Sequence, residues 1–395
     1  MSISEKVRLL LAEQSWIRRM FEEGAALKKK YGKENVFDLS LGNPVMEPPA
    51  EFTRELKKLA EHPLPGMHRY MENAGYLETR EAVAAQLRLE TGIKFTSSEI
   101  VMTCGAAAAL NVVLKTILNQ GDEVVIFAPY FVEYLNYIDN HNGRSVVLPT
   151  DDNFVPQLDA LEVAITVKTK AIILNSPNNP TGVIYSKDFL HQLGELLRQK
   201  EAEYGTQIFL LSDEAYRKII YDGLKYPFAS HHHTQTIIAT SHSKDLALPG
   251  ERIGYIAVHP DINHKRELVD GLAYCNRTLG FVNAPALMQH LMRHLQQVTV
   301  SVTEYQQKRD FLYHHLINMG YEVIKPQGAF YLFPKSPLED DVTLVKELQN
   351  SMVLTVPGSG FGTPGYFRIA YCVDDKTLEG CLTGFRRVAQ KFNLT

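Results

Sequence analysis

The chain has 395 residues and a formal net charge of −4, and its composition is 45% hydrophobic and 22% charged. These proportions are ordinary for a globular protein with a sizeable core, and the length allows two domains. The mildly acidic balance argues against a nucleic-acid-binding surface, and no apolar run is long enough to predict a membrane-spanning helix.

Four cysteines occur in the chain, at Cys104, Cys275, Cys372 and Cys381, with neither a metal-binding spacing nor a dense disulfide framework. Reduced thiols of this kind are typical of the cytosol. Charged residues interrupt the apolar residues at the amino terminus, which therefore lacks the core of a signal peptide. We expect a cytoplasmic protein without a membrane or nucleic-acid partner.

The first part of the chain predicts helices and one short strand. Apolar residues at helical intervals predict one or two amphipathic helices between residues 4 and 31. A strand is expected at 36–41. It ends at Gly42, where a glycine leaves room for a ligand but also suits a plain turn. A polar loop at 68–75 precedes a helix at 77–90.

Strands alternate with helices between residues 100 and 286, which predicts an α/β fold with a mainly parallel sheet covered on both faces. The predicted strands are 100–103, 123–127, 145–148, 171–175, 207–212, 237–240 and 253–259. The predicted helices between them are 106–119, 131–141, 159–167 and 188–204. Ligands of such sheets bind beyond the carboxyl ends of the strands.

A long helical stretch is predicted from 286 to 318, and we place a domain boundary at its start. Beyond it, short segments predict a smaller α+β domain, at 321–324, 329–333, 344–349, 352–356, 367–371 and 378–392. The expected division is an amino-terminal arm with part of the small domain at 1–48, a large domain at 49–285 and the small domain at 286–395.

Lys244 follows a short apolar strand and lies among groups that suit a phosphorylated ligand. Ser241 and Ser243 precede it, and Arg252 opens the next apolar run. Hydroxyls and a guanidinium bind a phosphate monoester. Nearby cations or desolvation lower the pKa of an amine so that it can form an imine. A lone lysine in a turn is ordinarily solvated, so its neighbours are what predict a Schiff-base lysine.

Three further turns follow predicted strands. Gly105, Ala106 and Ala107 open a helix whose free amides favour a phosphate, although tight packing also explains small residues there. Asn179 either donates to a phenolate or carboxylate or only stabilises its turn. Asp213 ends an apolar strand, where it either holds a protonated pyridine nitrogen or caps a helix.

Several short motifs follow one another along the chain, namely Gly105-Ala106-Ala107, Pro129-Tyr130-Phe131, Asn178-Asn179-Pro180-Thr181-Gly182, Asp213-Glu214-Ala215-Tyr216, Ser241-His242-Ser243-Lys244, Arg252 and Phe367-Arg368-Ile369. Their order and spacing resemble those of the class I aminotransferases, which are fold type I pyridoxal 5′-phosphate (PLP) enzymes. The resemblance covers nearly the whole chain, from Gly42 to Arg368. It implies a homodimer that exchanges the amino group of an L-α-amino acid with a 2-oxo acid.

The resemblance also implies a role for individual residues. Lys244 would form the internal aldimine with PLP and then move a proton as general base and acid, and Asp213 and Tyr216 would complete the catalytic set. The implied substrate-binding residues are Gly42, Asn179 and Arg368. The implied cofactor-binding residues are Gly105, Ala106, Ala107, Phe131, Asn179, Asp213, Tyr216, Ser241, Ser243, Lys244, Arg252 and Tyr70.

Within this set, the resemblance distinguishes the parts of the cofactor. Asp213 would pair with the pyridinium nitrogen, and Asn179 and Tyr216 would bond the 3′-oxygen. Phe131 would stack on the ring. The phosphate would be held by Ser241, Ser243, Arg252 and the amides of Ala106 and Ala107. Tyr70 would reach the phosphate of the neighbouring subunit, and Arg368 would bind the substrate α-carboxylate.

Departures from the family pattern leave the substrate open. Phe131 stands where aspartate-specific members often have tryptophan. Ala107 stands where some bacterial aspartate enzymes have a lysine for the distal carboxylate. Arg277 lies near the position of a partner-chain arginine that reads this carboxylate in other members, but Thr278 is the residue that aligns with it.

Three other features are predicted to have no special role. The glycine-rich stretch 358–362 is followed by a strand, where a dinucleotide-binding loop would need a helix. The consecutive histidines 231–233 lack a spacing that would converge on a metal. Cys104 is expected to be a small buried residue.

Two alternative functions stay open at the level of the sequence. The same cofactor chemistry supports β-elimination or decarboxylation. A non-catalytic effector-binding module, of the kind attached to some transcription regulators, would need a DNA-binding domain before the cofactor domain. The stretch before Gly42 is too short for one.

Overall fold

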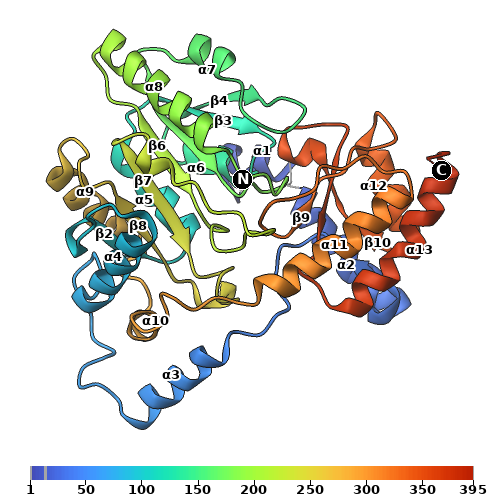
Figure 1. Ribbon diagram of the computed structural model, residues 1–395, viewed down its shortest axis with the longest axis horizontal. Helices are drawn as coiled ribbons and strands as arrows, with labels where there is room; N and C mark the ends of the chain where they lie inside the picture. Colours follow the sequence, from blue (N-terminus) through green and yellow to red (C-terminus); the bar gives the residue numbers. More distant parts are fainter. Residues whose placement is uncertain (1, 13–15, 395) are drawn as a thin grey trace.

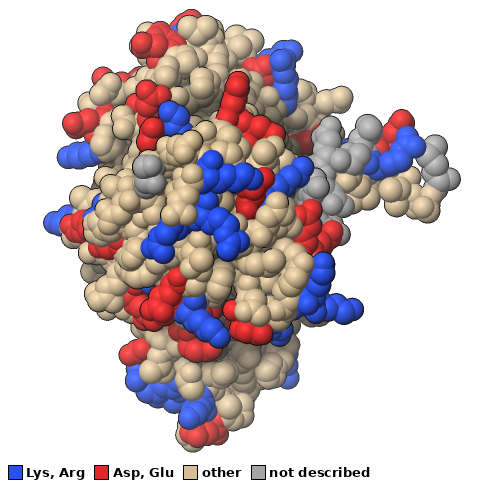
Figure 2. All heavy atoms as spheres, turned by 90° about the vertical axis from the view of Figure 1, so that its right-hand side faces the viewer, with Lys and Arg blue, Asp and Glu red and all other residues tan. Residues whose placement is uncertain are grey.

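The structure, a computed structural model, describes residues 2–12 and 16–394. Figure 1 shows a large body built around a central sheet and, beside it, a smaller group of helices and short strands. Within the described residues, no helix combines the length and the apolar character needed to cross a membrane. On the face shown in Figure 2, basic and acidic side chains are interspersed over most of the surface.

The central sheet has seven strands in the order β2-β8-β7-β6-β5-β3-β4. β8 runs antiparallel to β2 and β7, and the remaining pairs are parallel. The strands are β2 (Ile100–Thr103), β3 (Glu123–Ala128), β4 (Arg144–Pro149), β5 (Thr169–Asn175), β6 (Phe209–Asp213), β7 (Thr236–Ser241) and β8 (Gly254–Val258). The prediction of a mainly parallel seven-stranded sheet is confirmed.

Helices cover both faces of this sheet, because successive residues of a buried strand point to opposite sides. In β5, Ile172 belongs to the apolar cluster that includes α8, whereas Ile173 belongs to the cluster that includes α5 and α9. The helices of the large body are α3 (Ala50–Glu61), α4 (Leu77–Thr91), α5 (Ala106–Ile117), α6 (Glu133–Asp139), α7 (Leu158–Ala164), α8 (Lys187–Tyr204), α9 (Lys265–Thr278) and α10 (Ala286–Met292).

The smaller group takes elements from both ends of the chain. β1 pairs in parallel with β10, and β11, β12 and β9 form an antiparallel sheet. The strands are β1 (Phe37–Asp38), β9 (Tyr331–Leu332), β10 (Val353–Leu354), β11 (Val356–Pro357) and β12 (Phe367–Ala370). The helices are α2 (Trp16–Tyr31), α11 (Val302–Asn318), α12 (Asp341–Asn350) and α13 (Asp375–Lys391). Helix α1 (Glu5–Ala12) instead lies beside the large body, where Lys6 pairs with Asp139 at the end of α6. The predicted α+β character is confirmed.

Several predicted elements differ from the observed ones. The single helix expected at 286–318 is two helices, α10 and α11, because β-branched residues at 298–300 disfavour helix and Ser301 caps α11 by accepting from the amide of Glu304. Residues 321–324 form no strand. Helices α3 and α9 were not among the predicted elements. Residues 13–15 of the predicted amino-terminal helix lie outside the described residues.

Short 3-10 helices occupy Lys33–Asn35, Ser97–Glu99, Ala229–His231, Pro249–Glu251 and Gly358–Phe361. The last of these leads into β12 and not into an α-helix. The glycine-rich stretch 358–362 therefore lacks the helix that a dinucleotide-binding loop requires. Among the described residues, no group of three or more histidine, cysteine or acidic side chains is arranged to hold a metal ion.

Replacement of Gly254 by alanine is predicted to destabilise the protein. An added Cβ would lie 2.3 Å from the carbonyl oxygen of Thr240 and 2.9 Å from the Cα of Gly105. Because both contacts are to backbone, relief requires β8 to move, which lowers the free energy of unfolding by about 1–3 kcal/mol. Urea unfolding followed by circular dichroism measures the difference.

Gly250→Ala is the matched control, because nothing lies within 4 Å of a Cβ added there. Its free energy of unfolding should stay within about 0.5 kcal/mol of the unmodified protein. Equal losses for the two variants would contradict the packing argument.

Candidate active site

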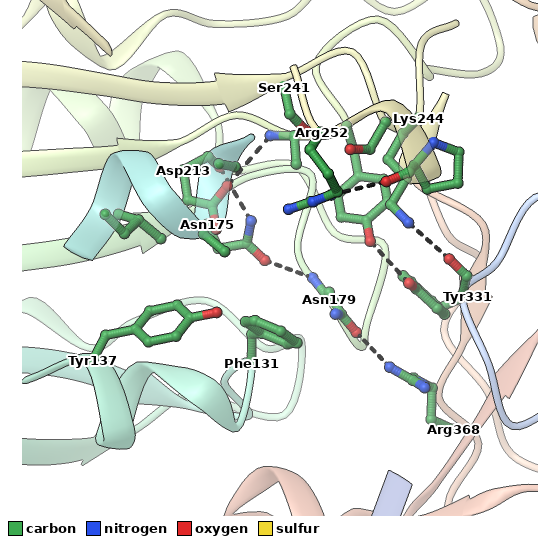
Figure 3. Close-up of a pocket in the computed structure, with 18 residues that line it drawn as sticks. Phe131, Tyr137, Asn175, Asn179, Asp213, Ser241, Lys244, Arg252, Tyr331 and Arg368 are labelled. Atoms are coloured by element: carbon green, nitrogen blue, oxygen red, sulfur yellow. Dashed lines mark hydrogen bonds between the residues drawn. The ribbon is translucent and has the colours of Figure 1, made fainter. Parts of the chain in front are cut away.

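The carboxyl ends of three neighbouring strands meet at one cavity. β5 ends at Asn175, β6 at Asp213 and β7 at Ser241, and the turn after β2 leads into α5 at the same edge. The cavity has a volume of about 290 Å³ (Figure 3). Its lining residues are Gly42, Ala106, Ala107, Leu110, Phe131, Tyr137, Asn175, Asn179, Asp213, Ala215, Tyr216, Ser241, Ser243, Lys244, Pro249, Arg252, Tyr331 and Arg368.

Lys244 lies in the turn after β7 and extends its amine into this cavity. Its Nζ donates to the carbonyl oxygen of Gly42 at 2.7 Å and lies 5.5 Å from the centre of the Phe330 ring. Burial lowers the pKa of Lys244 to about 8, and the positive charges of Arg368 and Arg252 act in the same direction. A much larger fraction of this amine is therefore neutral near pH 8 than is usual for lysine.

One end of the cavity fits a phosphate. Gly105, at φ 87°, precedes the first residues of α5, whose amides have no partner within the helix. A Cβ on Gly105 would lie 2.8 Å from Nη2 of Arg252, so glycine admits the guanidinium to this turn. Ser241 and Ser243 line the same cavity. Amide and hydroxyl donors beside one guanidinium suit a dianion.

Asp213 is buried at the end of β6 and has two donors to its carboxylate. Tyr134 donates to Oδ2 at 2.5 Å, and the amide of Ala215 donates to Oδ1 at 3.4 Å. Burial raises the pKa of Asp213 to about 6, although both donors oppose this shift. Asp213 is therefore mainly ionised at neutral pH and lies where a protonated ring nitrogen could meet it.

A chain of hydrogen bonds runs from β6 to Arg368 (Figure 3). Asn175 donates from Nδ2 to the carbonyl oxygen of Asp213 at 3.1 Å and accepts from the amide of Asn179 at 2.8 Å. Arg368 donates from Nη1 to Oδ1 of Asn179 at 3.0 Å. The loop after β5 is thereby fixed between the large sheet and β12.

Arg368 is buried among aromatic and backbone groups. Its Nη2 donates to the carbonyl oxygen of Ser40 at 2.6 Å. Its guanidinium lies 4.6 Å from the centre of the Tyr331 ring and 4.8 Å from that of Phe361, and its Nε has no protein partner. The hydroxyls of Tyr331 and Tyr216 are 2.8 Å apart. A buried guanidinium with an unpaired N–H is suited to bind a carboxylate.

All of the site residues predicted from the sequence line this one cavity, except Gly105 and Tyr70. Gly105 lies beside Arg252 at the cavity edge. Tyr70 is 91% exposed and does not line the cavity, so a role for it needs a second chain. Arg277 is exposed at the end of α9. Cys104, expected to be buried, is only partly so.

Sequence reasoning missed three residues that shape the site. Tyr134 contacts Asp213, Tyr137 lines the cavity and Asn175 joins two strand ends. The two tyrosines are three residues apart on α6, just after the motif that contains Phe131, and this spacing places them on one helical face. The sequence predicts a helix at 131–141, but helical periodicity does not show where the tyrosine hydroxyls lie.

Comparison with known proteins identifies a family whose members match this chain over most of its length. A family model described as "Aminotransferase class I and II" matches residues 34–385. An aspartate aminotransferase of Pyrococcus abyssi is 32% identical, over 98% of this chain and 99% of its own. An aromatic-amino-acid aminotransferase of Thermococcus litoralis is 32% identical, over 98% of each chain.

A crystal structure of an aminotransferase from Eubacterium rectale superposes with a TM-score of 0.96 at 38% identity, covering 100% of both chains. The cavity that contains Lys244, Asp213 and Arg368 thus lies in a fold shared over the full length of the chain. The chain belongs to the class I and II aminotransferase family, whose members depend on PLP.

Proposed function

We propose that this cavity carries out the reversible transfer of an amino group from an L-α-amino acid to a 2-oxo acid. The observation that supports it best is the meeting of Lys244, Asp213, Asn179, Arg252 and Arg368 in one cavity, although they come from distant parts of the sequence. When bound, PLP supplies an aldehyde that condenses with amino groups and a protonated ring that withdraws electrons from the reacting carbon. The two half-reactions then follow each other in a ping-pong order.

Lys244 is proposed to be the nucleophile and the proton carrier. With a pKa of about 8, its amine is partly neutral at physiological pH and can attack an aldehyde. Once displaced by the incoming amino acid, the same amine would remain within the cavity, where it could take the proton from the substrate Cα and give it to the carbon that bears the cofactor's aldehyde. The carbonyl oxygen of Gly42 holds the amine at 2.7 Å and so orients it.

We assign each remaining residue to the part of PLP that its side chain is suited to bind. Asp213, buried and ionised, would hold the ring nitrogen in its protonated form. Asn179 and Tyr216 would donate to the 3′-oxygen, and Phe131 would cover the ring. The phosphate would lie between the hydroxyls, the guanidinium and the helix amides, that is, Ser241, Ser243, Arg252, Ala106 and Ala107.

Arg368 is proposed to bind the substrate α-carboxylate, with Asn179 and the backbone of Gly42 assisting. The guanidinium is held by Asn179 and Ser40 before any substrate arrives, and its Nε remains unpaired. A fixed guanidinium loses little conformational freedom on binding, and this favours affinity for the carboxylate shared by all the amino acids and oxo acids.

We also propose a cytoplasmic homodimer, with the domain division 1–48, 49–285 and 286–395 expected from the sequence. The exposed ring of Tyr70 is free to reach a second chain, as the implied contact with the partner's phosphate requires.

For the substrate, the relatives are named for aspartate and for aromatic amino acids. We propose a screen of both classes, because neither Phe131 nor Ala107 matches an aspartate-specific pattern.

The reaction is tested by supplying PLP-loaded protein with a panel of L-amino acids and measuring every product. Transamination gives the 2-oxo acid together with pyridoxamine phosphate. Pyruvate with free ammonia would instead indicate β-elimination, and carbon dioxide with an amine would indicate decarboxylation. Lys244→Ala should lower the rate at least about 100-fold, because it removes the proton carrier. Lys168→Ala, at an exposed turn, is the control.

The pH dependence of covalent PLP capture follows from the lowered pKa of Lys244. The neutral amine is the reactive form, so the capture rate should rise about tenfold per pH unit at low pH and level off above its pKa. Stopped-flow absorbance on cofactor-free protein should place the midpoint near the pKa of about 8. A midpoint near the ordinary lysine value of 10.5 would contradict the burial of this amine.

Arg368→Lys should raise KM for the amino acid and the oxo acid alike. Lysine cannot form the paired hydrogen bonds of a guanidinium, so kcat/KM should fall about 10-fold to 100-fold. The affinity for PLP should hardly change, since Arg368 is not among the proposed cofactor contacts. Arg266→Lys, at an exposed position on α9, serves as the matched control. An unchanged KM in Arg368→Lys would refute the carboxylate role.

A further inference from the structure

Tyr134 lies beneath the cavity and touches the carboxylate that faces it. It is the second residue of α6, and its side chain is only 2% exposed. Its hydroxyl is 2.5 Å from Oδ2 of Asp213. Burial and the neighbouring carboxylate hold the pKa of Tyr134 well above its usual range. The phenol therefore keeps its proton and is the donor in this hydrogen bond.

The position of Tyr134 is fixed by the segment that also supplies Phe131. The amide of Tyr134 donates to the carbonyl oxygen of Phe131 at 3.0 Å, and the two rings pack edge to face with centres 5.6 Å apart. A shift of this short helix would therefore move both the ring that lines the cavity and the hydroxyl that contacts Asp213. Tyr134 also belongs to the apolar cluster beneath the sheet, which restricts its rotamer.

The two oxygens of Asp213 have unequal surroundings. Oδ2 accepts the short hydrogen bond from Tyr134, whereas Oδ1 accepts only a long one, at 3.4 Å, from the amide of Ala215. Asn175 contacts the backbone carbonyl of Asp213 and not its carboxylate. Among the described residues, Tyr134 is thus the side chain that donates to this carboxylate, and it leaves Oδ1 able to accept a further donor.

We propose that Tyr134 is a positioning residue, which holds the Asp213 carboxylate ionised and turned so that Oδ1 receives the N–H of the cofactor ring. This inference rests on the proposed role of Asp213. A buried carboxylate without donors takes up a proton and becomes a poor partner for a pyridinium. Loss of the Tyr134 hydroxyl therefore weakens the hold on the ring nitrogen and leaves the phosphate and 3′-oxygen contacts in place.

The test compares PLP with an analogue in which carbon replaces the ring nitrogen. Tyr134→Phe removes the hydroxyl and keeps the ring, so the fold should be retained. Its Kd for PLP, measured on cofactor-free full-length protein by fluorescence titration, should rise about tenfold, the effect of losing a hydrogen bond to a charged group. Its Kd for the analogue should change less than about twofold, because no ring N–H is present to be held.

Tyr305→Phe is the matched control, because Tyr305 is equally buried and its hydroxyl has no partner. It should leave both Kd values unchanged. Equal weakening of PLP and analogue by Tyr134→Phe would show a general structural role and overturn the proposal. No weakening of either ligand would overturn it as well.

The variant Asp213→Asn tests the proposed role of Asp213 separately from that of Tyr134. If this variant loses affinity for PLP selectively and Tyr134→Phe does not, Asp213 holds the ring nitrogen and only the role of Tyr134 is wrong. If Asp213→Asn affects PLP and analogue equally, Asp213 does not hold the ring nitrogen, and both assignments fail together. Selective loss in both variants supports the proposal.

Discussion

The site depends on the desolvation of two ionisable groups of opposite charge, Lys244 and Asp213. Burial disfavours the charged form of either group, so it moves the pKa of Lys244 down to about 8 and that of Asp213 up to about 6. The proposed chemistry needs Lys244 neutral and Asp213 ionised. Desolvation alone therefore favours the neutral form of Lys244. Asp213 needs hydrogen-bond donors that stabilise its ionised form against desolvation, and these are Tyr134 and the amide of Ala215.

The fold satisfies this constraint by bringing strand ends together and then tying them to the smaller group of elements. Asn175, at the end of β5, bonds both β6 and the amide of Asn179, and Asn179 in turn accepts from Arg368 on β12. A second tie joins the two groups away from the site, where the fully buried Arg309 of α11 donates from both Nη atoms to Asp222. Disturbing either tie would change the cavity, since its walls come from both parts of the chain.

The arrangement of the sheet and its polar turns was predictable because it depends on local patterns. Apolar runs of strand length alternate with helices, and parallel strands place their carboxyl ends at one edge. Asn179, Asp213 and Lys244 each follow such a run, so their meeting could be inferred before any coordinates. The roles within the site came from the resemblance of the motifs to a family, since each residue taken alone is more commonly explained by a turn or a helix cap.

What could not be predicted depends on contacts between residues far apart in sequence. Tyr134 and Asp213 are 79 positions apart, and a tyrosine at helical spacing among apolar residues indicates core packing and nothing about its hydroxyl. The break between α10 and α11 was missed for a similar reason. The amide of Val300 donates to the carbonyl of Asp245, the residue next to Lys244, so the connection serves a tertiary contact that helical periodicity does not reveal.

The contacts of Arg368 show why residues distant in sequence matter for the binding of a carboxylate. A guanidinium has five N–H groups, and bonds to Asn179 and Ser40 leave others free, including the buried Nε. The guanidinium lies over the rings of Tyr331 and Phe361, and its N–H groups point outward in its own plane. In the proposed role of Arg368, a substrate carboxylate that approaches in this plane meets donors that are already oriented, so the side chain is ordered on folding and not on binding.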